Sequence, residues 1–169
     1  MAQRPQRRHI RLTYTATGES ARAELLDDEA PEVCRFIWDR LPLEAPLIHG
    51  MYSGAEVFML IDNPADAPAQ NMVQIPLPGE LFYFFDPGGN STGGTAPQAE
   101  ICIVYNRGVT LKGPEGAPTY ARLFARIPGD WKYDWRDFAA ACRRVRWEGP
   151  QRLRIEREDV GREALNVER

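Results

Sequence analysis

The sequence of 169 residues has few of the side chains that bind transition metals. It contains two histidines and three cysteines, and Cys34, Cys102 and Cys142 stand far apart in apolar surroundings. Because no two of them have the short spacing of a zinc site, we expect no metal site. An odd number of widely spaced cysteines favours reduced, buried thiols over a disulfide framework.

Long hydrophobic runs are also absent from the sequence. No apolar stretch approaches the length of a membrane span, and the first residues lack the apolar middle of a signal peptide. The formal net charge of −3 gives no general attraction to nucleic acid or to an anionic membrane. The arginines of 143–146 and 152–154 are interpreted as a solvated face. We therefore expect a cytoplasmic protein without a nucleic-acid or membrane partner.

The Gly-rich segment 86–95 lacks two features that a phosphate-binding loop requires. Such a loop ends in Lys followed by Ser or Thr and opens a helix, whereas this segment contains no lysine and leads into an apolar, strand-like run. We therefore interpret it as a surface loop that is either flexible or covers a ligand, and we expect no cofactor.

The sequence is rich in short apolar segments with the periodicity of strands. Apolar and polar residues alternate in 10–14 and 21–25, as expected of a hairpin. A helix is expected from Pro31 to about Leu41, and a second from about Asp134 to Arg146, where apolar residues recur at helical spacing. Further strands are expected at 55–61, 72–75, 81–85, 101–105, 119–127 and 152–157.

These elements predict a mainly β protein, with a closed or nearly closed β-barrel of about eight strands and two helices. The sequence shows no internal repeat and no domain boundary, so residues 1–169 are expected to form a single domain. Residues 1–8 and 158–169 are expected to be flexible tails.

Three motifs, in this order, resemble the cyclophilin-like fold. They are Ala30-Pro31-Glu32-Val33-Cys34-Arg35-Phe36, Pro78-Gly79-Glu80-Leu81-Phe82-Tyr83-Phe84 and Glu100-Ile101-Cys102-Ile103-Val104-Tyr105. They are similar to motifs of small bacterial cyclophilin-like proteins of unknown function, and the similarity runs from about Ile10 to Glu156. The resemblance implies a cyclophilin-like barrel with a cavity near residues 49–56.

True cyclophilins carry a Phe-His-Arg segment, whose arginine stabilises the twisted prolyl amide. The corresponding stretch from His49 to Glu56 contains no arginine. Because a group that stabilises the transition state is missing, we do not expect a true cyclophilin. Peptidyl-prolyl isomerase activity is kept as a third hypothesis only.

The leading hypothesis is a protein that binds a small polar or carboxylate metabolite in a cavity near one end of the barrel. His49 would act as an acid or base near neutral pH, and Glu56 on the next strand would orient it. The candidate ligand-binding residues are Tyr52, Ser53, Tyr83 and Tyr105. Whether the protein is an enzyme stays open.

Structural roles are the alternative for each of these residues. His49 reads equally as a partly buried histidine bound to backbone, and the tyrosines as packing residues. The alternative for Glu56 is a position on a solvated strand face, and Glu100, at the start of its strand, is equally interpreted as a strand-end charge in water.

The second hypothesis is a non-catalytic subunit that forms homo-oligomers. Trp131, Tyr133 and Trp135 stand close together in the sequence and are typical of such a contact. The sequence leaves open the ligand, the reaction and the oligomeric state.

Overall fold

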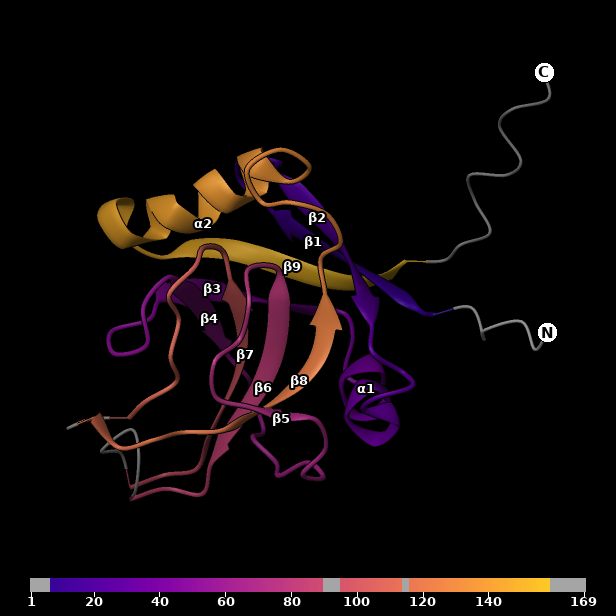
Figure 1. The fold of residues 1–169 in the computed structure, drawn as a ribbon, viewed down its shortest axis with the longest axis vertical. Coiled ribbons are helices and arrows are strands. Elements are labelled where there is room, and N and C mark those ends of the chain that lie inside the picture. Colours follow the sequence, from indigo (N-terminus) through magenta and orange to yellow (C-terminus); the bar gives the residue numbers. More distant parts are fainter. Residues whose placement is uncertain (1–6, 90–94, 114–115, 159–169) are drawn as a thin grey trace.

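The fold was analysed in a computed structural model that describes residues 7–89, 95–113 and 116–158. This part of the chain forms nine strands and two helices (Figure 1). In chain order they are β1 (His9–Tyr14), β2 (Ser20–Leu25), α1 (Pro31–Trp38), β3 (Leu43–His49), β4 (Glu56–Leu60), β5 (Met72–Val73), β6 (Glu80–Asp86), β7 (Gln98–Val104), β8 (Ala121–Arg126), α2 (Arg136–Glu148) and β9 (Gln151–Glu158).

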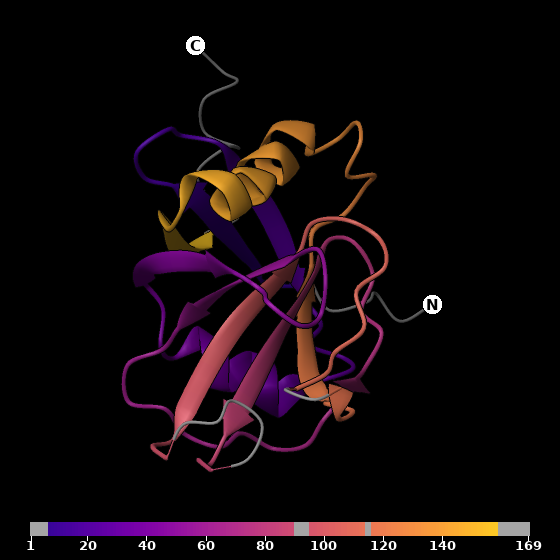
Figure 2. The same cartoon turned by 90° about the vertical axis from the view of Figure 1, so that its left-hand side faces the viewer.

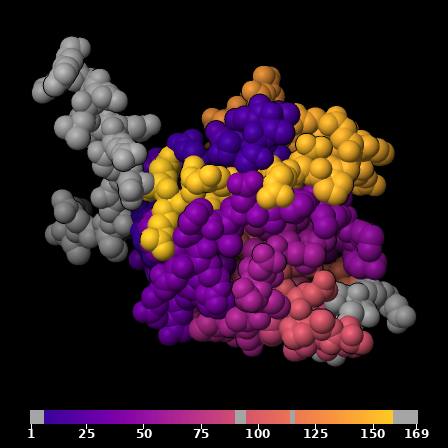
Figure 3. All heavy atoms as spheres, turned by 180° about the vertical axis from the view of Figure 1, so that it is seen from behind, coloured from indigo at the N-terminus to yellow at the C-terminus, as the bar shows by residue number. Residues whose placement is uncertain are grey.

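Eight of the strands form a closed antiparallel barrel, which confirms the predicted fold class. Their order is β2-β1-β9-β3-β4-β7-β6-β8, and the pairing of β2 with β8 closes the ring. The short strand β5 is not part of the ring. It pairs with Ala121 and Arg122 at the start of β8. The first and last strands of the chain are neighbours in the barrel, so the C-terminal strand lies against N-terminal segments (Figure 3).

The barrel interior is filled by one large hydrophobic core. Alternate residues of the strands point into it, for example Ile10, Leu12 and Tyr14 of β1. Both helices add buried side chains to the same core, among them Ile37 from α1 and Phe138 from α2. The helix α2 crosses one end of the barrel, and α1 lies toward the other end (Figures 1 and 2).

The helix α1 and the C-terminal strand β9 differ in detail from the prediction. The helix α1 begins at Pro31 as predicted but ends at Trp38, three residues before Leu41. At the C-terminal end of the described chain, Glu158 belongs to β9, pairs with His9 and forms an ion pair with Arg22. Glu158 is therefore part of the sheet and not of the predicted tail, and residues 159–169 lie outside the described residues.

A second, smaller cluster covers the outer face of β4, β6 and β7. Its buried members are Phe82, Cys102, Val104, Val109, Leu111 and Ala121. The strands alternate between the two clusters: Leu81 and Ile103 belong to the interior, whereas Phe82 and Cys102 belong to the outer face. The outer face of these three strands is therefore partly buried as well, because Val109 and Leu111 of the segment after β7 pack against it (Figure 2).

Candidate functional site

A pocket of about 300 Å³ lies on the outer face of β4, β6 and β7. We expected a cavity near one end of the barrel, and the pocket is instead on the outside of its wall. An eight-stranded barrel either is filled by its own side chains or holds one small ligand, and here fully buried residues such as Tyr14, Tyr83 and Phe124 occupy the interior. The lining residues are Ile48, Gly50, Met51, Tyr52, Ser53, Glu56, Phe58, Leu60, Phe82, Phe84, Gln98, Glu100, Cys102, Leu111, Lys112, Gly113 and Thr119.

Three phenylalanines form the floor of the pocket because of the strand register. Phe58 of β4 and Phe82 of β6 are both paired with Cys102 of β7, so the three side chains form one row across the sheet. In the next row on this face, Glu100 stands between Leu60 and Phe84. The floor is thus largely apolar, with one thiol and one carboxyl group in it.

Glu56 is the second carboxyl group of the pocket. It pairs with Val104, four residues along β7 from Glu100, so the row of Cys102 separates the two carboxyl groups. Glu56 is only 7% exposed. Within the described residues, its Oε2 atom is buried and has no hydrogen-bond partner. A buried carboxylate oxygen without a partner is costly, so a hydrogen-bond donor that reached Oε2 would be stabilising.

Both carboxyl groups change protonation near neutral pH. Burial raises the pKa of Glu56 to about 7, opposed by a hydrogen bond from Ser53 and assisted by the charge of Glu100. Burial likewise raises the pKa of Glu100 to about 7, opposed by its contact with Cys102 and assisted by the charge of Asp86. The pocket therefore holds two carboxyl groups that can accept or donate a proton at physiological pH.

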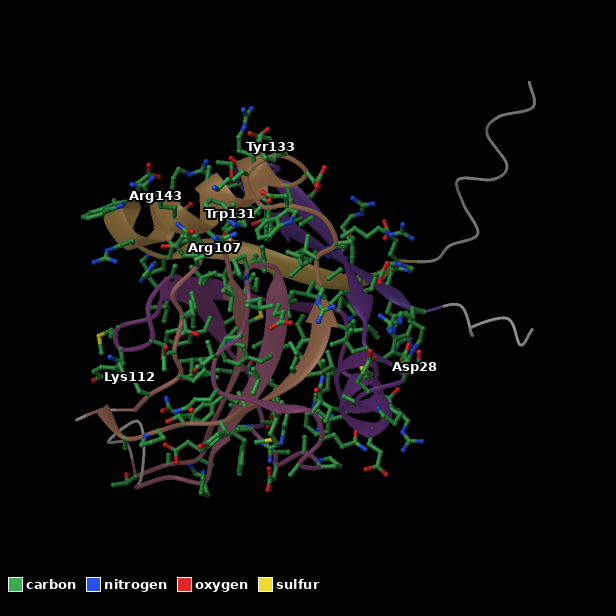
Figure 4. All side chains as sticks on the ribbon, viewed as in Figure 1. Asp28, Arg107, Lys112, Trp131, Tyr133 and Arg143 are labelled. Atoms are coloured by element: carbon green, nitrogen blue, oxygen red, sulfur yellow. The ribbon has the colours of Figure 1, made fainter. Side chains whose placement is uncertain are left out.

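The mouth of the pocket is formed by the loop 50–55 and the segment after β7. Ser53 joins them, because its carbonyl oxygen accepts a hydrogen bond from Thr110 N at 3.0 Å and its Oγ one from Lys112 N at 3.4 Å. The exposed Lys112 supplies the positive charge of the lining, and Figure 4 shows it at the edge of the molecule.

Of the six residues proposed from the sequence, Tyr52, Ser53 and Glu56 line the pocket. His49 and Tyr105 are brought together outside it, with 2.8 Å between His49 Nε2 and the Tyr105 hydroxyl. His49 pairs with Val57, so it faces the side of β4 opposite to Glu56. The structure therefore does not join His49 to Glu56, and the acid–base role of His49 stays a prediction.

The imidazole of His49 is held at both nitrogens. The carbonyl of Gly50 lies 2.8 Å from Nδ1 and can only accept, so Nδ1 carries a proton. Burial lowers the pKa of His49, which favours the neutral ring. In that form Nε2 accepts the hydrogen bond that the Tyr105 hydroxyl donates.

Tyr83 points into the barrel and not into the pocket. Its hydroxyl donates a hydrogen bond to the carbonyl of Ala65 at 2.6 Å, and its ring lies 5.1 Å from that of Phe36. Both observations fit a packing role.

Sequence reasoning did not single out Glu100 or the phenylalanines as site residues. The signal that could have found Glu100 is alternation, because Gln98, Glu100 and Cys102 share one face of a strand whose other face is Ala99, Ile101 and Ile103. A charged residue on a strand buried on both sides is unusual. The unusual position of Glu100 could be recognised only after the structure showed that the outer face of β7 is covered.

Two further properties follow from the described residues. Across 7–89, 95–113 and 116–158, no three side chains of His, Cys, Asp or Glu are arranged to hold a metal ion. In the same ranges, neither helix has the length and apolar character needed to span a membrane.

Comparisons with known proteins give a family but no activity. No curated protein matches the chain. The structure of McbB in complex with tryptophan is similar with a TM-score of 0.63 and 17% identity, over 88% of this chain and 44% of that one, so this chain spans less than half the length of McbB. The solution structure of a hypothetical protein from Archaeoglobus fulgidus is similar with a TM-score of 0.54 and 17% identity, over 94% of this chain and 100% of that one.

At this level of identity the two likenesses show the fold alone, and neither structure is described as a cyclophilin. The family model that matches is described as "Protein of unknown function (DUF3830)", and it matches residues 12–156. The match covers most of the chain. The chain therefore belongs to the DUF3830 family of proteins of unknown function.

Proposed function

We propose that this protein binds a small amine with an aromatic or otherwise apolar body in the pocket on the outer face of the barrel. The observation that carries the proposal is the pair of carboxyl groups, buried Glu56 and half-buried Glu100, in a cavity floored by phenylalanines. The ammonium group would lie at the carboxyl groups, and the apolar body against Phe58, Phe82 and Phe84.

The charge of the pocket favours an amine over a carboxylate. A ligand ammonium would supply the missing partner of Glu56 Oε2 and favour the ionised form of both carboxyl groups. A ligand carboxylate at the same depth would meet like charge, which is repulsive. Among the lining residues that the structure describes, Lys112 at the mouth is the one cation, so an amino acid would place its carboxylate there.

The proposal modifies the hypothesis drawn from the sequence in one respect. The small-molecule ligand is kept, and the carboxylate ligand is replaced by an amine or a zwitterion. The structural neighbour McbB is described in complex with tryptophan, an aromatic amine. That description supports testing aromatic amines first.

For turnover of such a ligand, we assign proton transfer to Glu56. A carboxyl group with a pKa near 7 can both remove and return a proton at neutral pH. It lines the pocket, whereas His49 does not. We assign to His49 the role of holding Tyr105 and the start of the loop at Gly50.

The test uses three ligands with the same ring and different charges: 2-phenylethylamine, phenylalanine and 3-phenylpropionate. Calorimetric titration at pH 7 should show the amine or the amino acid binding and the acid binding at least about tenfold more weakly. Glu56→Gln, which keeps the size of the side chain, should weaken amine binding about tenfold or more. Glu156→Gln on the exposed face of β9 is the matched control. Equal binding of the acid and the amine, or an unaffected Glu56→Gln, would refute the proposal.

The cyclophilin-like resemblance and a cytoplasmic location are also part of the proposal. The closed barrel, the opening hairpin and the helix that starts at Pro31 support the resemblance. Three free, buried cysteines support a reducing compartment. A proline-peptide assay tests the isomerase hypothesis, and we expect no activity.

Formation of a homo-oligomer is the second candidate function, and the surface that we propose for it differs from the one predicted from the sequence. Trp135 is buried and Trp131 is half-buried, which leaves only Tyr133 of the three predicted aromatic residues largely exposed. Apolar side chains are exposed at the pocket mouth instead, with Met51 at 79% and Tyr52 at 46%. Light scattering of the purified protein tests this candidate, and a strict monomer would contradict it.

A further inference from the structure

A second hollow of about 300 Å³ lies beside α2, and it shares no lining residue with the first pocket. Its walls come from the end of β7, from the turn before α2 and from α2 itself. Figure 4 shows Arg107, Trp131 and Arg143 together on this side of the molecule. No role has yet been assigned to this region.

Small residues on α2 create the hollow. Arg136, Ala140 and Arg143 follow one another at spacings of four and three, so they lie on one face of the helix. The methyl group of Ala140 leaves space between the two arginines. Trp131 and Tyr105 stand at the sides of this space and provide ring surfaces.

The rim of the hollow is positively charged. Lys132, Arg136 and Arg143 are exposed lining residues, in a protein whose formal net charge is −3. The nearby Asp134 accepts a hydrogen bond from the backbone N–H of Asp130 at 2.6 Å, and so serves the turn. Arg136 has an ion pair with Asp137 at 3.5 Å, but both side chains are largely exposed, which makes that pair weak.

Tyr105 gives the hollow a rigid wall. It is only 6% exposed, and its hydroxyl is bound by His49 at 2.8 Å. Burial raises the pKa of Tyr105, while the charges of Arg146 and Arg143 act in the opposite direction. An aromatic ring and several cations are thus held around the same space.

From this arrangement we propose that the hollow beside α2 binds a small aromatic anion, with its ring against Trp131 and Tyr105 and its acidic group on Arg143, Arg136 and Lys132. Guanidinium groups bind carboxylate and phosphate in the same bidentate manner, so the ligand class is a flat ring that carries either group. This hollow and the pocket on the outer face of the barrel would then select opposite charges.

The experiment titrates the full chain, at low salt, with four probes. Indole-3-carboxylate and adenosine monophosphate carry a ring with a carboxylate or a phosphate, indole is the ring without charge, and inorganic phosphate is the charge without a ring. We expect saturable 1:1 binding of at least one ring-bearing anion, at least about tenfold tighter than that of indole or phosphate. The preferred anion identifies the acidic group.

Three variants locate the binding. Arg143→Gln removes one charge and should weaken binding about tenfold, whereas Ala140→Leu keeps every charge, fills the hollow and should abolish binding. Arg35→Gln on the exposed side of α1 is the matched control and should bind as the unmodified protein does. Glu56→Gln should also leave anion binding unchanged, because Glu56 belongs to the other pocket.

Any of three results would overturn the inference. The first is no saturable binding of either ring-bearing anion. The second is binding that survives Ala140→Leu, which would indicate general attraction to surface charge. The third is tighter anion binding in Glu56→Gln, which would place the anion in the first pocket, where the charge of Glu56 repels it.

Discussion

The side chain of Glu56 packs directly over Gly50. A Cβ atom added to Gly50 would lie 2.6 Å from Glu56 Cγ and 2.8 Å from Glu56 Oε1. Gly50 does not have a positive φ, so it is needed here for space and not for backbone freedom. Its N–H also donates a hydrogen bond to the Glu56 carbonyl at 2.9 Å. The position of the carboxyl group in the pocket therefore depends on the absence of one side chain.

We predict that Gly50→Ala displaces the Glu56 side chain and lowers the free energy of unfolding by about 1–3 kcal/mol, the usual cost of overpacking. Amine binding should weaken at the same time. Urea denaturation gives the first value and calorimetric titration the second. The double variant Gly50→Ala/Glu56→Ala should recover much of the lost stability, because the clash is then removed. Strict additivity of the two substitutions would contradict this contact.

Glu56 and Glu100 should make the protein less stable as the pH rises through neutrality. Burial raises their pKa from its ordinary value of 4.5 to about 7. The folded state therefore binds more protons than the unfolded state between these values. The corresponding stability is present below pH about 4.5 and is lost as the pH rises through about 7, by at most about 3–4 kcal/mol per carboxyl group.

Glu56→Gln tests this pH dependence because it removes one titrating group. The variant should be more stable than the unmodified protein at pH 8, and the difference should shrink or reverse at pH 5. Urea denaturation at both pH values gives the comparison. If the two proteins lose stability equally between pH 5 and pH 8, Glu56 does not have a raised pKa.

His49 and Glu56 should have separable effects on ligand binding. Glu56 lines the pocket, while His49 holds Tyr105 and Gly50 on the other side of the strand. We expect His49→Gln to change the dissociation constant of 2-phenylethylamine by less than about threefold, against about tenfold or more for Glu56→Gln. A larger effect of His49→Gln, in a variant that unfolds at the normal urea concentration, would return His49 to the site.

The three thiols should be unreactive in the native protein. Burial raises the pKa of Cys34 and of Cys142 to about 12, and that of Cys102 well above its usual value. Since the thiolate is the reactive form, a thiol reagent at pH 8 should modify native protein very slowly and all three cysteines quickly after unfolding. One fast-reacting cysteine in the native protein would show that a buried thiol is accessible.

The strands and helices were predictable from local patterns, and their ends less so. Ile10, Leu12 and Tyr14 point inward as their alternation predicts, and Pro31 begins α1. The helix α1 ended earlier than the sequence indicated. Only part of 86–95 can be compared with its prediction as a loop, since 90–94 lie outside the described residues.

The candidate site was predictable only in part. Tyr52, Ser53 and Glu56 were predicted as site residues, and they line the pocket. They could be predicted because the loop beside a strand end is recognisable in the sequence. The predicted contact between His49 and Glu56 is not present in the structure. The register between β3 and β4 decides which side chains of the two strands share a face, and it is not visible in the sequence. His49 stands opposite Val57, and one residue along a strand is enough to change the face.

The sequence by itself determined that this chain forms a barrel of antiparallel strands with two helices, since the period of its apolar residues is a local property. It also determined that each strand has one face for the interior. Only the tertiary structure decided that the other face of β4, β6 and β7 is covered, and that Glu56 and Glu100 share a pocket with Phe58 and Phe82. The reason is physical: hydrogen-bonded register and burial join segments that are far apart in the chain, and local periodicity carries no record of either.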